Sequence, residues 1–165
     1  MNLVPINQTE LYGLDDEFNE FVKLYIQNKL PNKILLSGEK GIGKSTLAYH
    51  LINYILSENE ENSYNVEKFV IHSENRSYKL IQNGTSPNFY LIDISSEKKS
   101  IDINQIRNLI NNLNKSTFNS KPRFVLIDNI EYLNLSSVNA LLKILEEPND
   151  NIFFILIHNN KKIVS

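Results

Sequence analysis

One short segment constrains the fold of this chain more than any other. Residues 38–45 read Gly38-Glu39-Lys40-Gly41-Ile42-Gly43-Lys44-Ser45 and match the phosphate-binding pattern G-x-x-x-x-G-K-[ST] at every fixed position. The apolar run Ile34-Leu35-Leu36-Ser37 before it predicts a short buried strand, and the apolar spacing from Thr46 to Leu56 predicts an amphipathic helix. Strand, glycine turn and helix in this order predict an α/β protein in which backbone N–H groups and the positive end of a helix converge on phosphate oxygens.

The last two residues of the motif predict binding of a nucleotide together with a divalent cation. Lys44 would neutralise charge on the β- and γ-phosphates, and the Ser45 hydroxyl could coordinate Mg²⁺, which prefers oxygen ligands. The alternative interpretation is an ordinary glycine-rich turn before a helix. With Gly at ~7% of average residues, a complete match arises by chance in roughly one chain of this length per hundred or fewer. The motif therefore predicts binding of a nucleoside triphosphate.

Composition narrows the class of protein further. With 165 residues, of which 41% are hydrophobic, the chain can bury one sizeable core, so we expect a single nucleotide-binding domain over residues 1–165. Its net charge of −2 provides no basic face for autonomous DNA binding. The absence of cysteine excludes a disulfide framework, and each histidine is isolated from other ligands at zinc spacing, so we expect no zinc site.

No segment of the sequence predicts export or insertion into a membrane. The first ten residues lack the charged and apolar regions of a signal peptide. No apolar run approaches the ~20 residues that span a bilayer. We therefore expect a cytoplasmic protein that makes no contact with a membrane.

The rest of the chain alternates predicted helices and strands. Apolar residues at helical spacing predict helices capped by Asp15 or Asp16 and ending before Pro31, over residues 73–82, around residues 106–113, and from Asn134 or Ser136 to Pro148. Short apolar runs predict strands over residues 89–92, 124–127 and 152–157, the last followed by His158 and Asn159. These runs are continuous rather than alternating, as in parallel strands covered by helices, so we predict a mostly parallel sheet.

Asp128 ends the predicted strand over residues 124–127. The carboxyl ends of strands are where doubly wound sheets bind ligands, so we predict that Asp128 holds Mg²⁺ together with Ser45, directly or through water. The alternative is an aspartate in a turn or a helix cap, and the upstream phosphate motif favours the metal ligand. The helix that follows is predicted to bury an apolar stripe of Val138, Leu141, Leu142 and Leu145.

The segment from Asn139 to Pro148 carries a family resemblance. It reads NALLKILEEP, and in its place after Asp128 it resembles the signature of bacterial AAA+ clamp-loader subunits, the gamma/tau and delta-prime subunits of the DNA polymerase III holoenzyme. Four further segments are similar to delta-prime in particular: Leu11-Tyr12-Gly13, Lys29-Leu30-Pro31, Ser86-Pro87 and residues 101–107. The resemblance covers nearly the whole chain and implies the three-layer P-loop NTPase (AAA+) fold.

The resemblance also implies roles for individual residues. The implied nucleotide-binding residues are Tyr12 and Gly13 near adenine, Gly38, Glu39, Lys40, Gly41, Ile42, Gly43, Lys44, Ser45 and Thr46 around the phosphates, and Asn159 as a sensor of the γ-phosphate. Asn159 is alternatively a simple loop residue after a strand. Asp128 matches the Walker aspartate, but Asn129 stands where active members carry the glutamate that polarises water. The resemblance thus implies weak or no hydrolysis, with Glu131 a weaker substitute for that glutamate.

A delta-prime-like clamp-loader subunit is the function that the resemblance implies. Such a subunit binds ATP and Mg²⁺, assembles with the gamma/tau and delta subunits, and helps load the sliding clamp on primed DNA. Two alternatives stay open: a gamma/tau-type motor subunit, and a nucleotide-dependent AAA+ scaffold outside replication. The family's Ser-Arg-Cys motif, fifth strand, lid domain and collar domain would all follow Ser165, so we expect this chain to be an incomplete amino-terminal portion.

Overall fold

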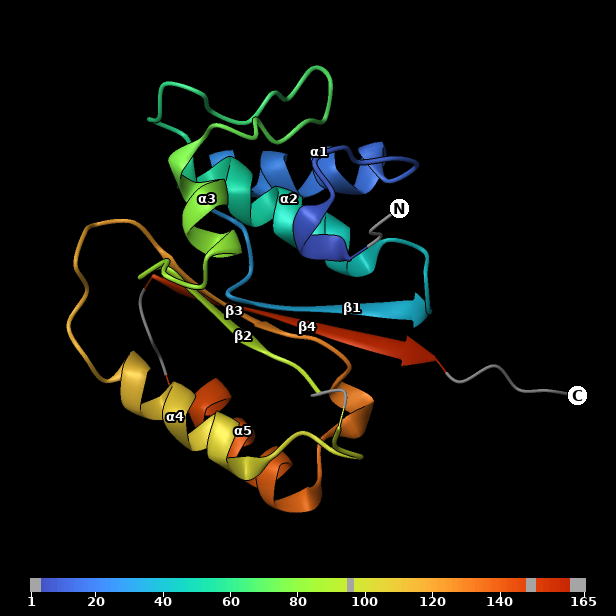
Figure 1. Cartoon of the computed structure of the whole chain (residues 1–165), viewed down its shortest axis with the longest axis vertical. Helices are drawn as coiled ribbons and strands as arrows, with labels where there is room; N and C mark the ends of the chain where they lie inside the picture. Colours follow the sequence, from blue (N-terminus) through green and yellow to red (C-terminus); the bar gives the residue numbers. More distant parts are fainter. Residues whose placement is uncertain (1–3, 95–96, 148–150, 161–165) are drawn as a thin grey trace, which may run out of the picture. The chain divides into compact units, whose positions relative to one another are not determined.

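The structure is a computed structural model that describes residues 4–94, 97–147 and 151–160. The chain divides into two compact units, one of Met1–Pro31 with Gly41–Ser86 and the other of Asn32–Lys40 with Pro87–Ser165. The first unit holds the amino-terminal helices, and the second holds the sheet with the remaining helices (Figure 1).

The second unit is built on four parallel strands, β1 (Lys33–Glu39), β2 (Phe89–Ile92), β3 (Arg123–Ile127) and β4 (Ile152–Asn160). Their order in the sheet is β1-β4-β3-β2, so the last strand of the chain lies between the first and the third. The register pairs Gly38 with Asn159 and Ile127 with Leu156. The predicted parallel α/β sheet is confirmed, and the polar residues that follow the strands gather at its carboxyl edge.

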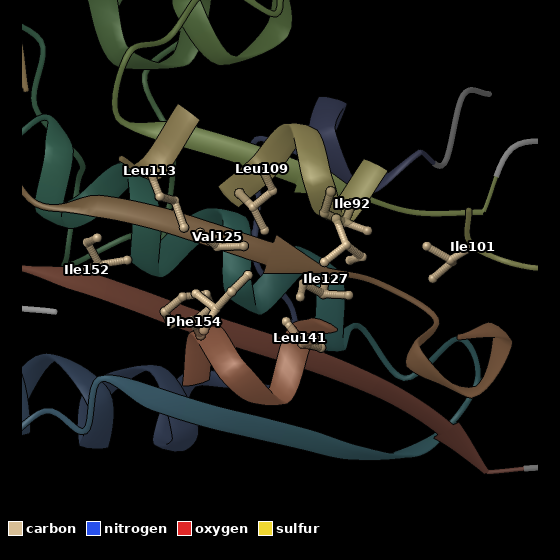
Figure 2. Packing of buried hydrophobic residues seen from close by; sticks show 11 residues of the cluster. Ile92, Ile101, Leu109, Leu113, Val125, Ile127, Leu141, Ile152 and Phe154 are labelled. Atoms are coloured by element: carbon tan, nitrogen blue, oxygen red, sulfur yellow. The ribbon is translucent and has the colours of Figure 1, made fainter. Parts of the chain in front are cut away.

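Two helices, α4 (Ile103–Leu113) and α5 (Leu135–Glu146), pack against one face of this sheet (Figure 2). The cluster between them contains Ile92, Ile101, Ile106, Leu109, Leu113, Val125, Ile127, Leu141, Ile144, Ile152 and Phe154. Burial of one such side chain stabilises a fold by about 1.5–3 kcal/mol. Side chains cap both helices: the carboxylate of Asp102 accepts the Asn104 N–H, and the amide oxygen of Asn134 accepts the Ser137 N–H. Of the two predicted starts of this helix, Asn134 or Ser136, the structure confirms Asn134, which caps α5.

One position of the predicted α5 stripe is wrong. Leu142 is 47% exposed, whereas Leu141 and Ile144 are buried. Adjacent residues of a helix point about 100° apart, so Leu141 and Leu142 cannot both face the centre of the core. The buried face follows Ser137, Leu141 and Ile144 instead, at the i, i+4, i+7 spacing.

Over residues 4–31 and 41–86, the described part of the first unit, the structure shows three α-helices and a short 3₁₀ helix, namely η1 (Pro5–Asn7), α1 (Asp15–Ile26), α2 (Lys44–Leu56) and α3 (Arg76–Gln82). Its centre is aromatic: Phe18 is fully buried, stacks on Tyr64 at 5.0 Å and meets Tyr54 and Phe69 edge-on. Such ring pairs add about 0.5–1.5 kcal/mol each beyond their buried area. The helix α2 is buried on most of its surface, and the apolar residues of the predicted helix that it buries include Leu47, Ala48, Leu51, Ile52 and Ile55.

Three helix starts differ from the predictions. The helix α1 is capped by Leu14 with no side-chain hydrogen bond, and Asp15 and Asp16 lie in its first turn, where carboxylates favour the positive helix end. The helix α2 starts at Lys44 rather than Thr46, and α3 starts at Arg76 because Asn75 caps it. No helix in the part of the chain that the structure describes is long and apolar enough to cross a membrane.

Candidate functional site

The first half of the phosphate motif continues a strand. Gly38 and Glu39 are the last residues of β1, where they pair with Asn159 and Asn160 of β4. Glu39 and the following Lys40 are exposed. The motif therefore begins at the carboxyl edge of the parallel sheet, where α/β proteins bind their ligands.

The second half of the motif belongs to the first unit and opens α2. Gly41 and Gly43 have φ angles of +89° and +96°, which L side chains rarely adopt. Gly43 is the N-cap, so Lys44 and Ser45 occupy the first turn of the helix. That turn contains no acidic side chain, and the positive end of a helix favours an anion through its N–H groups and its dipole.

Lys44 and its neighbours differ in exposure. Lys44 is buried, Ser45 and Thr46 are half-buried, and Ile42 is exposed. In the same unit a side-chain carbon placed on Gly43 would lie 3.1 Å from Cδ1 of Leu14, so the loop passes close to the chain just before α1.

The two residues predicted near adenine, Tyr12 and Gly13, lie in that approach to α1. Tyr12 is 78% exposed, and Gly13 has a φ of +72°. The preceding Leu11 is buried and its N–H donates to the Phe69 carbonyl at 3.1 Å. The pair thus follows directly on an anchored residue and stands open to a ligand.

In the second unit, Asn129 connects the ends of three strands. Its Nδ2 donates to Oδ1 of Asp93, which follows β2, at 2.8 Å. Its Oδ1 accepts from Nδ2 of Asn159, in β4, also at 2.8 Å. Asn129 itself follows Asp128 after β3 and has a φ of +55°, which Asn tolerates better than most residues. Both ends of its amide are occupied, and an amide is in any case no proton acceptor for water.

Glu131 and Asp128 complete this cluster. Oε2 of Glu131, in the 3₁₀ helix η2 (Ile130–Tyr132), accepts the backbone N–H of Asn159 at 3.3 Å. Oδ1 of Asp128 accepts the backbone N–H of Asn129 at 2.8 Å, and Asp128 is half-buried. The structure therefore brings together Asp128, Asn129, Glu131 and Asn159, which the sequence singled out separately.

Ser37 and Asp93 belong to the same edge and were missed in the sequence. Oγ of Ser37 lies 3.0 Å from Nδ1 of His158 and 3.3 Å from Oδ1 of Asn160, across the β1–β4 pair. The signal for Asp93 was present, because it follows an apolar strand just as Asp128 does. No comparable signal marks Ser37, whose partners come from a strand 121 residues later.

The donors suit Mg²⁺ by their chemistry. Mg²⁺ in triphosphate sites takes one or two protein oxygens and completes its shell with phosphate and water, and the Ser45 hydroxyl and the Asp128 carboxylate are hard oxygen donors of that kind. Within residues 4–94, 97–147 and 151–160, no three His, Cys, Asp or Glu side chains come together as a metal cage. A phosphate-borne cation needs no such cage.

Comparison of the chain with known proteins identifies a family. Residues 13–165 match the sequence model of a protein family described as "DNA polymerase III, delta subunit". DNA polymerase III subunit delta' of Buchnera aphidicola subsp. Baizongia pistaciae is 27% identical over 164 residues, which are 96% of this chain and 45% of that protein. DNA polymerase III subunit gamma of Buchnera aphidicola subsp. Schizaphis graminum is 34% identical over 128 residues, which are 78% of this chain and 33% of that protein.

A solved structure is similar in fold. It is a DNA polymerase III gamma subunit-related protein from Thermotoga maritima, with a TM-score of 0.55 and 24% identity over 85% of this chain and 38% of that one. This likeness, together with the parallel sheet, confirms the predicted α/β fold. The chain spans less than half the length of each of these three proteins.

Proposed function

Because this chain belongs to the DNA polymerase III delta subunit family, we propose that it is the nucleotide-binding part of a delta-prime-like clamp-loader subunit. In this role it works in the cytoplasm with gamma/tau and delta subunits, and the assembly loads a sliding clamp on primed DNA. The observation that carries the proposal is the complete phosphate motif at a strand-to-helix connection, within a family match over residues 13–165.

The ligand is ATP with Mg²⁺. The backbone of residues 38–43 and the first turn of α2 hold the phosphates, Lys44 neutralises their charge, and Ser45 and Asp128 hold the cation. Tyr12 and Gly13 lie along the base, and Asn159 responds to the γ-phosphate. When bound, Mg²⁺ would neutralise charge on the phosphate oxygens. All of these residues act within one nucleotide-binding domain over residues 1–165.

Turnover of the bound ATP is slow. The position after the Walker aspartate is Asn129, and its amide is hydrogen-bonded at both ends, to Asp93 and to Asn159. Glu131 is the next carboxylate along the chain, but its Oε2 accepts the backbone N–H of Asn159. The amide of Asn129 cannot take a proton from water, and one oxygen of Glu131 is held by the Asn159 backbone, so we expect nucleotide to act here as a bound ligand that stabilises one state of the subunit.

Titration with labelled ATP and Mg²⁺ tests the proposal. We expect saturable binding that Lys44→Ala weakens at least tenfold, because each tenfold loss corresponds to about 1.4 kcal/mol and a buried ammonium beside phosphates contributes more than that. Lys40→Ala is the matched control, since Lys40 is an exposed cation of the same motif. A folded sample without saturable binding, or with equal losses in both variants, would contradict the proposal.

A gamma/tau-type motor subunit is the second candidate, favoured by the 34% identity to a gamma subunit over 128 residues. Asn129 argues against it, because a motor needs the carboxylate that this position lacks. Co-purification separates the remaining options. A clamp-loader subunit brings down gamma/tau and delta partners, whereas an AAA+ scaffold outside replication brings down neither.

A further inference from the structure

The helix that opens with the phosphate motif also carries a buried polar stripe. His50, Asn53 and Ser57 follow one another at the i, i+3, i+7 spacing of one helix face, and each is at most 1% exposed. Buried polar groups are unfavourable unless they are hydrogen-bonded. Each of the three is bonded to another segment of the first unit: His50 to Gln8 and Tyr64, Asn53 to Asn75, and Ser57 to Tyr64. The polar face of α2 therefore holds these segments in place.

Asn53 and Ser57 form hydrogen bonds with the segments that follow α2. Asn53 exchanges two amide hydrogen bonds with Asn75, at 2.9 and 3.1 Å, and Oδ1 of Asn75 also accepts the N–H of Tyr78 in the first turn of α3. Oγ of Ser57 accepts the Tyr64 N–H at 3.0 Å. These bonds explain how the polar loop over residues 57–65 and the short α3 are held without a large apolar face.

His50 ties the segment that precedes α1. Its Nε2 lies 2.9 Å from the Gln8 carbonyl oxygen, which can only accept, so Nε2 carries the proton and donates. Its Nδ1 then accepts from the Tyr64 hydroxyl at 2.7 Å. Both ring nitrogens are used, which fixes one neutral tautomer and one ring orientation.

Further hydrogen bonds hold the chain between Gln8 and Tyr12, the first of the two residues proposed to contact the adenine base. The Thr9 carbonyl accepts the Ile71 N–H at 2.8 Å, and the Leu11 N–H donates to Phe69. Tyr12 and Gly13 follow, and then Leu14, whose Cδ1 approaches the phosphate loop at Gly43. The two base-facing residues thus span a short stretch between an anchor on α2 and the start of the same helix.

We propose that His50 is a positioning residue for the nucleotide base: its bond to Gln8 holds residues 8–11 against α2 and so presents Tyr12 and Gly13 to the adenine. This inference rests on the proposed function, and it deepens that function by separating two parts of the site. The phosphates bind to α2 directly, through its first turn. The base binds to a segment that α2 holds through His50, and a fixed segment loses less conformational freedom when the base arrives.

Two amide substitutions at residue 50 separate the two bonds of the imidazole. The Gln amide nitrogen reaches the place of Nε2, so His50→Gln keeps a donor for the Gln8 carbonyl and loses the acceptor for Tyr64. The shorter Asn side chain reaches only the place of Nδ1, so His50→Asn keeps the Tyr64 contact and loses Gln8. Tyr64→Phe is the matched control, because it removes the same Tyr64 bond as His50→Gln and leaves the bond to Gln8.

The experiment compares Mg²⁺-ATP with Mg²⁺-tripolyphosphate, which has the phosphates and no base, as ligands of the 165-residue chain. We expect His50→Asn to lower the affinity for ATP about tenfold and to change the affinity for tripolyphosphate by less than about twofold. His50→Gln and Tyr64→Phe should change the ratio of these two affinities by less than about threefold. A general loss of structure would weaken both ligands together, so the ratio distinguishes positioning from stability.

Three results would overturn the inference. The first is that His50→Asn lowers the affinities for ATP and for tripolyphosphate by the same factor. The second is that His50→Gln lowers the ratio of the ATP affinity to the tripolyphosphate affinity as much as His50→Asn does. The third is that the wild-type chain binds both ligands with equal affinity. In each of these, phosphate binding by the loop would stand. A wild-type chain that binds neither ligand would instead overturn the proposed function, and the inference with it.

Discussion

The protein has two groups of polar side chains that are chemically alike and differ in burial. The stripe on α2, made of His50, Asn53 and Ser57, is almost fully buried, while the cluster at the strand ends, which includes Asn129 and Asn159, is half-exposed. In the stripe, the hydrogen bonds of the three side chains join α2 to residues 8, 64 and 75, and the Ser57 hydroxyl also donates to Asn53. In the cluster the side chains form similar bonds, but Asp93, Asn129 and Asn159 each keep part of their surface exposed. Burial therefore assigns the first group to holding the fold and leaves the second group able to meet a ligand.

The largest effect is expected from Asn53→Ala. It leaves the Asn75 amide without its reciprocal partner in a buried site and opens a small cavity, so we expect the free energy of unfolding to fall by about 4 kcal/mol. Asn159→Ala, in the half-exposed cluster, is the matched control and should lose about 1 kcal/mol, because water can replace its partner. Urea denaturation measures both. Equal losses would remove the distinction between the two groups.

Acid should act through His50. Burial lowers the pKa of His50 from 6.5 to about 4, although the hydrogen bond to Gln8 acts in the opposite direction. Between these two pH values His50 is protonated in the unfolded chain and neutral in the folded protein. The free energy of unfolding therefore falls as the pH drops from about 6.5 to about 4, by about 3 kcal/mol in all. The free energy of unfolding of His50→Gln, measured across the same range, should lack this part of the slope. Parallel slopes in the two proteins would contradict the buried neutral histidine.

Asn129→Asp should give a pH dependence of the opposite sign. The new carboxylate would face Asp93 in place of the amide donor, and the like charges should reduce stability by about 1–2 kcal/mol at pH 7. Shared protonation raises the pKa of such a pair, so the loss should shrink as the pH falls toward 4. Asn108→Asp, exposed on α4, controls for the added charge and should shift stability by less than about 0.5 kcal/mol. A deficit that stays constant with pH would show that Asp93 does not face residue 129.

Glu131→Gln should have the smallest effect. The amide oxygen can still accept the Asn159 N–H at its long distance of 3.3 Å, so we expect stability to change by less than about 0.5 kcal/mol and ATP affinity to stay the same. Thermal unfolding and nucleotide titration check both statements. A large drop in ATP turnover with unchanged stability would instead identify Glu131 as the base.

Local signals in the sequence predicted most of the fold. The strand over residues 89–92 matches β2 at both ends, because a short continuous apolar run between turn residues has few other interpretations. Asn134 and Ser136 both suit the start of a helix, and the structure shows that Asn134 is the cap. The stripe of α5 failed at Leu142, since two adjacent leucines look alike until the direction of the core is known.

The hydrogen bonds within the site could not be predicted from such local signals. Asp93 and Asn129 are 36 residues apart, and they meet only because β2 and β3 are neighbours in the sheet. Likewise His50 looked like an isolated histidine, because its partners Gln8 and Tyr64 lie 42 and 14 residues away. Residue types and motifs can be read along a chain, whereas the hydrogen bonds that assign their roles depend on strand order and burial.

The fate of bound ATP tests the account most directly. The 165-residue chain is loaded with labelled ATP and Mg²⁺, separated from free nucleotide, and the ratio of bound ADP to bound ATP is followed with time. The account predicts that the label stays in ATP, because the Asn129 amide takes the place of a proton acceptor, and that Lys44→Ala retains little nucleotide of either kind. Rapid conversion to ADP that Lys44→Ala abolishes would contradict it.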